Sequence, residues 1–190
     1  MPTRTPAAQR ALEVAGALFY ERGITATGVD LIAAESGVAK TTMYAHFGNK
    51  EALVAAYLHA RGEAWRSHLR SEVAARAATP REQLLAIFDV LGEWMDGPDF
   101  RGCPFINAAA EYADPNHPVR RVVDAHRRWF RQTIQDLLDE INVPDSGRVA
   151  DQLVMLRDGA MVSGYLSDPS AVADALRDAC RAVIAFHAAS

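Results

Sequence analysis

Apolar side chains recur every three or four positions along almost the whole chain, and runs of alternating β-branched and polar residues are absent. This spacing places apolar side chains on one face of an α-helix. Turn signals rich in glycine, proline and aspartate separate the apolar stretches. The pattern predicts an all-α fold of about nine helices, near residues 6–22, 28–36, 40–47, 50–77, 80–95, 103–112, 117–141, 146–166 and 170–187.

The character of the helices changes near residue 50. Before this point short helices are joined by tight turns, and after it the helices are long. We therefore predict an N-terminal domain over residues 1–50 and a second helical domain over residues 51–190, with the boundary in the long helix that begins at Lys50. A chain of 190 residues is long enough for a small domain and a medium-sized one.

The second and third predicted helices have the spacing of a helix-turn-helix. Thr27 precedes the first of them and Asp30 follows three positions later, which predicts a capped N-terminus. Ala33 is small where two helices must cross closely. Gly37 stands four residues further on, where the chain reverses and a left-handed backbone conformation favours glycine. Val38 then returns to the core, and this succession is typical of the motif.

The outward face of the third predicted helix is rich in hydrogen-bond donors. A helix fits the major groove of DNA, where residues near its N-terminus reach base edges and flanking groups contact phosphates. Lys50 opens the next helix, and its ammonium group and the free N–H groups there form a suitable phosphate site. The alternative is a solvated polar face. The predicted donors are Lys40, Thr41, Thr42, Tyr44 and His46.

The stretch from Ala11 to Leu53 resembles the DNA-binding domain of the tetracycline-repressor (TetR) family. Two departures are small: Gly28 stands where the family usually has a hydroxyl residue, and Ala39 replaces a common serine. The matching pieces are Ala17-Leu18-Phe19, Arg22-Gly23, Thr27-Gly28-Val29, Ile32-Ala33, Gly37-Val38-Ala39-Lys40, Tyr44-x-His46-Phe47 and Asn49-Lys50-Glu51-Ala52-Leu53.

This resemblance implies a ligand-responsive transcriptional repressor that binds a palindromic operator in double-stranded DNA as a homodimer. It also implies roles for single residues. Thr27, Tyr44 and Lys50 would contact phosphates, and the side chains over bases or sugar-phosphate would be Lys40, Thr41, Thr42 and His46. Residues 100–111 are similar, more weakly, to a subgroup of the family's C-terminal domains, and they specify no ligand.

The overall charge does not by itself indicate a nucleic-acid partner. The net charge is −4 at pH 7. Residues 1–50 carry five basic and four acidic side chains, and residues 51–190 carry 15 and 20. Both lysines of the chain, Lys40 and Lys50, fall at the helix-turn-helix. Because the bias is small, the pattern of residues supports DNA binding more than the charge does.

The second predicted domain offers the side chains for an effector pocket. His126 falls on the apolar stripe of its helix, where it could contact a bound molecule or titrate near neutrality, or simply be a core residue. Aromatic and soft side chains with a few polar groups suit a mostly apolar small molecule, and core filling is the alternative. The candidates are Phe88, Trp94, Phe105, Asn107, Tyr112, His126, Trp129, Phe130, Met155 and Tyr165.

The last two predicted helices suit dimerisation. The first of them is apolar on two sides, one through Leu153 and the other through Met155, Val162 and Leu166, so burial on both sides is expected. Two such helices from each subunit would form a four-helix interface, and packing within one subunit is the alternative. The predicted interface residues are Leu153, Leu156, Ala160, Leu176 and Val183.

Other functional classes have weaker support. Cys103 opens a predicted helix and His126 lies downstream, but no third group completes a catalytic set, so we expect no enzyme. A redox-responsive regulator that uses Cys103 remains an alternative, as does a transcriptional activator of the same fold. Cys180 is distant in sequence, and the histidines show no metal-ligand spacing, so we expect neither metal nor cofactor. No apolar run is long enough to span a membrane, which favours a cytoplasmic protein.

Overall fold

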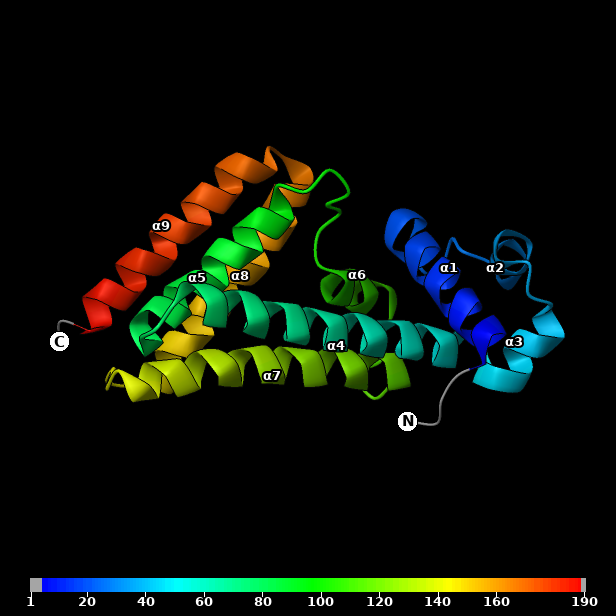
Figure 1. Cartoon of the computed structure of the whole chain (residues 1–190), viewed down its shortest axis with the longest axis horizontal. Helices are drawn as coiled ribbons and strands as arrows, with labels where there is room; N and C mark the ends of the chain where they lie inside the picture. Colours follow the sequence, from blue (N-terminus) through cyan, green and yellow to red (C-terminus); the bar gives the residue numbers. More distant parts are fainter. Residues whose placement is uncertain (1–4, 189–190) are drawn as a thin grey trace. The chain divides into compact units, whose positions relative to one another are not determined.

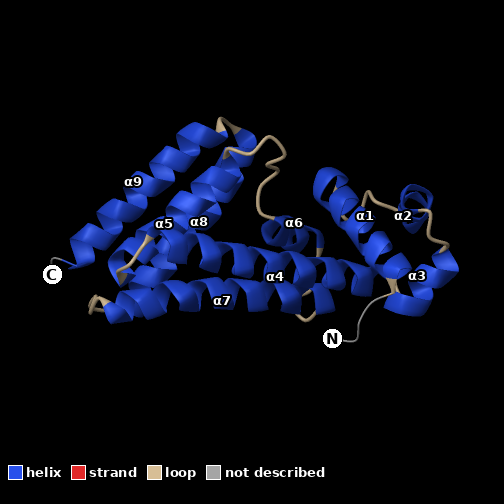
Figure 2. Cartoon of the chain, in the orientation of Figure 1, coloured by secondary structure: helices blue, strands red, loops and turns tan. Residues whose placement is uncertain are grey.

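The computed structural model describes residues 5–188, and in this range the chain forms nine α-helices and no strand (Figures 1 and 2). The all-α class is confirmed, and each predicted helix lies within one residue of an observed one at either end. No helix in this range combines the length and apolar character needed to cross a bilayer. The helices are α1 (Pro6–Arg22), α2 (Val29–Ser36), α3 (Lys40–Phe47), α4 (Lys50–Arg76), α5 (Pro80–Met95), α6 (Pro104–Glu111), α7 (Pro118–Glu140), α8 (Ser146–Leu166) and α9 (Pro169–Ala188).

The chain folds into two compact units that do not follow the order of the sequence. The first unit contains the residues up to Glu63 together with Pro104–Ala125, and the second contains Ala64–Cys103 together with the residues from His126 onward. The long helices α4 and α7 therefore each contribute to both units. A functional division at residue 50 stays a prediction.

The first unit is built around α1, which packs on α2 and α3. Thr5 caps α1 by accepting a hydrogen bond from the backbone N–H of Ala8, and Pro6 follows at the first helical position, where its missing N–H costs nothing. On the buried side of α1, Gly16 lies so close to Tyr57 of α4 that an added Cβ would come within 2.8 Å of the ring. The small residue therefore sets how closely α4 can approach α1.

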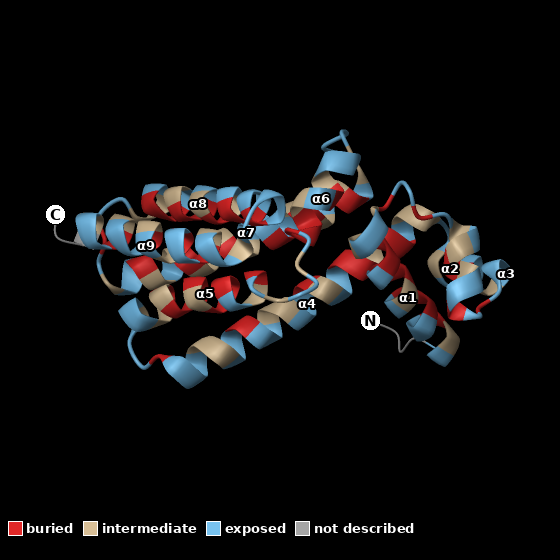
Figure 3. Cartoon of the chain, turned by 90° about the horizontal axis from the view of Figure 1, so that it is seen from above, coloured by how far each residue is buried: buried red, intermediate tan, exposed pale blue. Residues whose placement is uncertain are grey.

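The second unit packs α9 against both α5 and α8. Figure 3 shows buried and exposed positions alternating along α8 and α9, as expected for helices with one face in a core. Thr79 and Glu82 form a capping box at the start of α5, each accepting a hydrogen bond from the other's backbone. The buried apolar side chains of this core include Leu84, Phe88, Leu91, Met95, Leu153, Met161, Leu176 and Ile184.

Candidate nucleic-acid interface

The turn between α2 and α3 has the geometry that the sequence predicts. Gly37 takes the left-handed conformation, with φ of +64°, directly after α2 ends at Ser36. The Ser36 hydroxyl accepts a hydrogen bond from the backbone N–H of Val38, and the Ser36 carbonyl accepts one from Arg10 Nε of α1 at 2.9 Å. Ile32, Val38 and Met43 are buried beneath the turn. These contacts fix α3 on the rest of the first unit.

The outer face of α3 presents its donors to solvent. Only Met43 of this eight-residue helix is buried, whereas Lys40, Thr41 and Tyr44 are exposed and Thr42 is half-buried. Tyr44 is a large side chain with 46% of its surface exposed. A short helix with an exposed aromatic hydroxyl, hydroxyl groups and a cation matches the chemistry of major-groove and phosphate contacts.

Two of the donor side chains on α3 interact with other side chains of the same chain. Lys40 forms an ion pair with Asp30 of α2, and both side chains are at least half-exposed. His46 Nε2 lies 3.0 Å from the hydroxyl of Thr5, the residue that caps α1. An exposed pair of this kind contributes little to stability. Lys40 can therefore exchange Asp30 for a phosphate at small cost.

The start of α4 forms the second part of the donor-rich surface. Gly48 ends α3 with φ of +81°, and its N–H donates to the carbonyl of Tyr44 at 2.8 Å. The Asn49 side chain then caps α4 by accepting from the N–H of Ala52. Lys50 is the first residue of α4 and is half-buried. Its ammonium group thus lies at a helix N-terminus, where anions are favoured.

Thr27 does not occupy the position that its predicted roles require. Its side chain is fully buried, and its hydroxyl donates toward the carbonyls of Gly23 at 2.8 Å and Leu18 at 3.3 Å. The N-cap of α2 is Gly28, which has no side chain, so the predicted capping by Thr27 is wrong. Because the hydroxyl is turned inward, the expected Thr27–phosphate contact has no support in this arrangement.

Glu111, at the end of α6, is a site residue that the sequence does not reveal. Its carboxylate accepts hydrogen bonds from the backbone N–H groups of Ile24 at 2.8 Å and Thr25 at 2.5 Å, in the loop that follows α1. Burial acts to raise the Glu111 pKa, but these hydrogen bonds and the nearby charge of Lys50 outweigh it and hold the pKa below its usual value. Glu111 therefore clamps the loop that leads into α2.

His126 lies in a buried, positively charged environment in the second unit. Burial, followed by the charges of Arg157 and Arg66, lowers the His126 pKa to about 3. The expectation that His126 could titrate near neutrality is therefore wrong, and the ring is a neutral donor and acceptor at physiological pH. It lies 5.6 Å from the Trp129 ring, and the Arg66 guanidinium lies 4.9 Å above the same ring.

The predicted effector residues do not share one environment. Phe88 and Phe130 are buried in the second unit and Trp94 and Trp129 are half-buried there, whereas Phe105, Asn107 and Tyr112 belong to the first unit. Met155 and Tyr165 have 66% and 48% of their surfaces exposed, so including them in an interior pocket is wrong. The remaining second-unit candidates are Phe88, Trp94, His126, Trp129 and Phe130.

The predicted dimer residues lie mainly on the inward face of α8 and α9. Leu153, Ala160 and Leu176 are buried within their own chain, so assigning them to an interface with another copy is wrong. Leu156 and Val183 are half-buried. The sequence correctly predicts that α8 is apolar on two sides. Apolar periodicity alone does not indicate which of these sides packs in the chain's own core.

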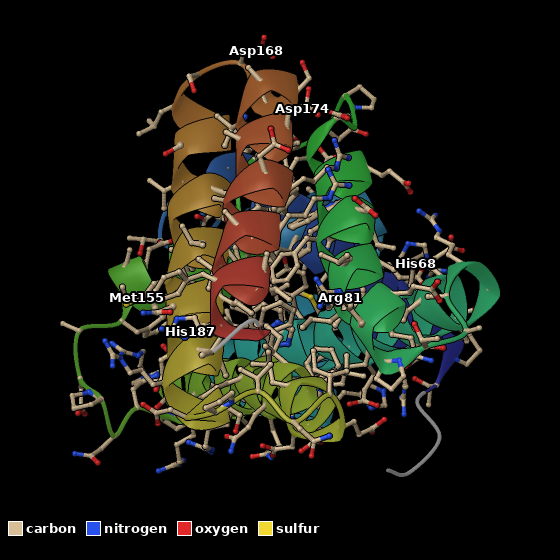
Figure 4. The ribbon with its side chains drawn as sticks, turned by 90° about the vertical axis from the view of Figure 1, so that its left-hand side faces the viewer. His68, Arg81, Met155, Asp168, Asp174 and His187 are labelled. Carbon is tan, nitrogen blue, oxygen red and sulfur yellow. The ribbon has the colours of Figure 1, made fainter. Side chains whose placement is uncertain are left out.

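An exposed apolar stripe runs along the opposite side of α8. It consists of Met155, Gly159, Val162 and Leu166, which share one helical face, and we refer to it below as the α8 stripe. Figure 4 shows Met155 on the outer side of α8, away from α5. An added Cβ on Gly159 would meet no atom within 4 Å, so this position is open. Phe186 of α9 is also strongly exposed.

Comparisons with known proteins agree with the helix-turn-helix interpretation. Residues 11–57 match the profile of bacterial regulatory proteins of the tetR family, and residues 80–180 match that of the tetracyclin repressor-like C-terminal domain. The chain is 26% identical over 147 residues to the HTH-type transcriptional regulator YjdC of Escherichia coli, covering 76% of this chain and 75% of that protein.

Solved structures extend the agreement to the whole fold. A TetR-family transcriptional regulator from Streptomyces coelicolor superposes with a TM-score of 0.88 at 38% identity, covering 96% of each chain. A putative TetR transcriptional regulator from Streptomyces avermitilis superposes with a TM-score of 0.78 at 27% identity, covering 93% of this chain and 99% of that one.

Proposed function

Because the chain belongs to the tetR family of bacterial transcriptional regulators, we propose that it is an effector-responsive repressor that binds a palindromic operator as a homodimer in the cytoplasm. The observation that carries this proposal is the donor-rich outer face of α3, held rigidly by the turn at Gly37 and continued by Lys50. We assign DNA binding to residues 1–50 and effector binding and dimerisation to residues 51–190. The two matched profiles, over residues 11–57 and 80–180, support this division.

The proposed DNA contacts divide into two groups. Tyr44 and Lys50 contact phosphates, which fixes the position of α3 on the duplex and makes binding dependent on salt. The side chains at the N-terminal end of α3 face base edges or the sugar-phosphate backbone; these are Lys40, Thr41 and Thr42, with His46 one turn further on. Thr27 is left out because its hydroxyl is buried.

Dimerisation is proposed through the α8 stripe, and the exposed Phe186 of α9 is a further candidate for the same interface. A contiguous row of exposed apolar side chains is unusual on a monomer and is typical of a contact with another protein. Two copies related by a two-fold axis would bring the same stripe onto itself, and the open position at Gly159 allows the two helices to approach closely.

The proposed effector site lies among the aromatic side chains of the second unit. Phe88, Trp94 and Phe130 provide apolar surface, and the neutral ring of His126 offers a polar contact beside Trp129. An effector releases DNA only if it binds one arrangement of the dimer more tightly than the other. The helix α4 belongs to both units and begins at Lys50, so it is the element through which such a difference reaches the DNA contacts.

Selection of bound sequences from random double-stranded DNA tests this function directly. The full-length protein is expected to recover a palindrome whose two half-sites are centred about one helical turn apart, roughly 34–36 Å. The matched control is the triple variant Lys40→Ala, Tyr44→Phe, Lys50→Ala, which is expected to recover no motif. If both proteins recovered only a mixture of DNA sequences with no shared motif, the result would contradict the proposal.

A further inference from the structure

Arg157 of α8 is a buried cation whose hydrogen bonds are incomplete. The residue is 7% exposed, and an arginine side chain stays protonated at physiological pH. Its Nη1 donates to Asp158 at 2.8 Å, and its Nη2 donates to Cys103 Sγ at 3.3 Å. Its Nε is also buried, and no group within residues 5–188 accepts a hydrogen bond from it. A buried N–H without an acceptor is costly, so an acceptor placed beside Nε would be strongly favoured.

One edge of this guanidinium has the geometry that binds a carboxylate. Nε–H and an N–H of Nη2 point in the same direction, and this edge of arginine can hold two carboxylate oxygens in parallel. Among the described residues, the acceptor on this edge of Arg157 is the Cys103 sulfur, and a thiol is a weak acceptor. Asp158 is bound by Nη1 and leaves the edge free. A carboxylate there would gain two charge-assisted hydrogen bonds and displace at most one weak contact.

The charges around Arg157 favour one further negative charge. Arg127 and Arg157 share the single carboxylate of Asp158, so these three groups carry one net positive charge. The neighbouring His126 ring adds none, because burial and then the charges of Arg157 and Arg66 lower its pKa to about 3. Burial also limits the screening of these charges by water. A monoanion next to Arg157 would therefore neutralise a cation that is only partly compensated.

Aromatic rings lie next to the same charges. The Arg157 guanidinium lies 5.3 Å from the centre of the Phe130 ring, and the Arg66 guanidinium lies 4.9 Å from the centre of the Trp129 ring. The Trp129 ring centre is 6.2 Å from that of Phe130 and 5.6 Å from that of His126. Trp129 and Arg66 are half-buried, so this side of the cluster is in contact with solvent. A flat apolar group attached to the carboxylate would find ring faces beside the cation.

We propose that Arg157 is the anion-binding residue of the effector site and that the effector is an aromatic monocarboxylate. The carboxylate accepts hydrogen bonds from Nε and Nη2 of Arg157, and the ring packs beside Trp129 and Phe130. A carboxylate is favoured over a phosphate because it is planar, like the guanidinium edge, and carries the single charge that the site lacks. The role as effector rests on the proposed function, whereas binding of the carboxylate does not.

Calorimetric titration of the full-length protein compares benzoate and 2-naphthoate with benzamide and 2-naphthamide. Each carboxylate and its amide have the same ring and differ in the charge of one group. At least one carboxylate is expected to bind at least about tenfold more tightly than its amide, because charge-assisted hydrogen bonds are stronger than neutral ones. Inorganic phosphate is expected to bind more weakly than that carboxylate. Equal affinities within both pairs, no binding of either carboxylate, or tighter binding of phosphate would overturn the proposal.

Variants of Arg157 test whether this residue recognises the charge. Arg157→Met is expected to abolish the preference for the carboxylate and to leave the affinity for the amide unchanged, because the ring contacts remain. Arg128→Met removes an exposed guanidinium of α7 and is the matched control, expected to keep the preference. If Arg157→Met does not fold by circular dichroism, Arg157→Lys decides. It keeps the charge without the two parallel N–H groups, so the preference is expected to fall at least about threefold. A wild-type preference in the folded variant contradicts the role of Arg157.

Release of DNA separates this inference from the proposed function. The carboxylate preferred in the titrations is expected to weaken operator binding by the wild type at least about tenfold and to leave operator binding by the folded Arg157 variant unchanged. Fluorescence anisotropy with the operator recovered by selection measures both. Preferential binding of the carboxylate with unchanged operator affinity would refute its role as effector. A protein that recovers no operator would refute the proposed function, and the titrations would still decide whether Arg157 binds the carboxylate.

Discussion

Tyr44 and Lys50 are single side chains that hold the proposed protein–DNA contact in place, whereas Thr42 is proposed to read sequence. The outward position of Tyr44 could be predicted from the sequence because the helix-turn-helix restricts which positions of α3 face outward, whereas the DNA contacts themselves stay a prediction. Thr27 could not, because a hydroxyl near a helix start can cap forward or donate backward, and here it donates backward to Gly23. The spacing of residues in the sequence does not show whether the hydroxyl caps the following helix or donates to a preceding carbonyl.

The double variant Tyr44→Phe, Lys50→Ala is expected to weaken binding to every DNA sequence. It should also reduce the slope of log affinity against log salt, because fewer phosphates are contacted in each subunit. Fluorescence anisotropy at several salt concentrations measures both effects. An unchanged slope would remove Tyr44 and Lys50 from the phosphate contacts.

Thr42→Ala is expected to have a different effect from the double variant. If Thr42 reads a base, its loss relaxes preference at one position of each half-site and costs about 1–3 kcal/mol against the preferred base. Selection from random DNA compares the variant with the wild type. The same recovered motif from both proteins would contradict a role for Thr42 in reading sequence.

The buried ring of His126 predicts a pH dependence of stability. Its folded pKa of about 3 lies below the unfolded value of 6.5, so the unfolded state binds the extra proton first and stability falls as the pH drops from about 6.5 toward 3. A single group such as His126 changes the free energy of unfolding by at most about 1.4 kcal/mol per pH unit. The variant His126→Gln is expected to lose this contribution, so its stability should depend less on pH. Urea unfolding between pH 7 and 4 measures it, and identical slopes for both proteins would contradict a neutral buried ring.

At the level of elements, the nine helices found between residues 5 and 188 follow from caps, prolines and apolar periodicity, which are local features. Their assembly is less predictable. Glu111 meets the loop after α1 across more than 80 residues of sequence, and no local signal indicates this contact. The two apolar sides of α8 are visible in the sequence, but only packing against α9 and α5 shows which side is left exposed.

Removal of the Glu111 clamp is expected to loosen the loop that leads into α2. Glu111→Gln leaves an amide where two backbone N–H groups need an acceptor, so stability is expected to fall by about 1 kcal/mol. Hydrogen exchange should accelerate at Ile24 and Thr25 in particular. In the wild type the folded-state pKa is lowered, so the stabilisation is present above the usual carboxyl pKa and is lost as the pH falls through the folded value. Unchanged exchange at these two amides would contradict the clamp.

For the whole molecule, the α8 stripe is the feature on which proposed dimerisation depends. Val162→Asp combined with Leu166→Asp is expected to give a folded monomer, because both side chains are exposed and their removal does not disturb the chain's own core. Sedimentation or light scattering gives the mass, with Ser71→Asp at an exposed position of α4 as the control for added charge. A dimer that survives in the double variant would place the interface elsewhere.

The length of α4 has a mechanical consequence for operator choice. Its 27 residues span about 40 Å at 1.5 Å per residue. As a lever of that length, α4 displaces Lys50 by about 3.5 Å when it pivots through roughly 5° about its far end, which is close to the rise of one base pair along the duplex axis. In the proposed dimer, such a tilt in both subunits would change the separation of the two Lys50 residues by up to about 7 Å, so we expect the tilted dimer to prefer an operator whose spacer differs by one or two base pairs.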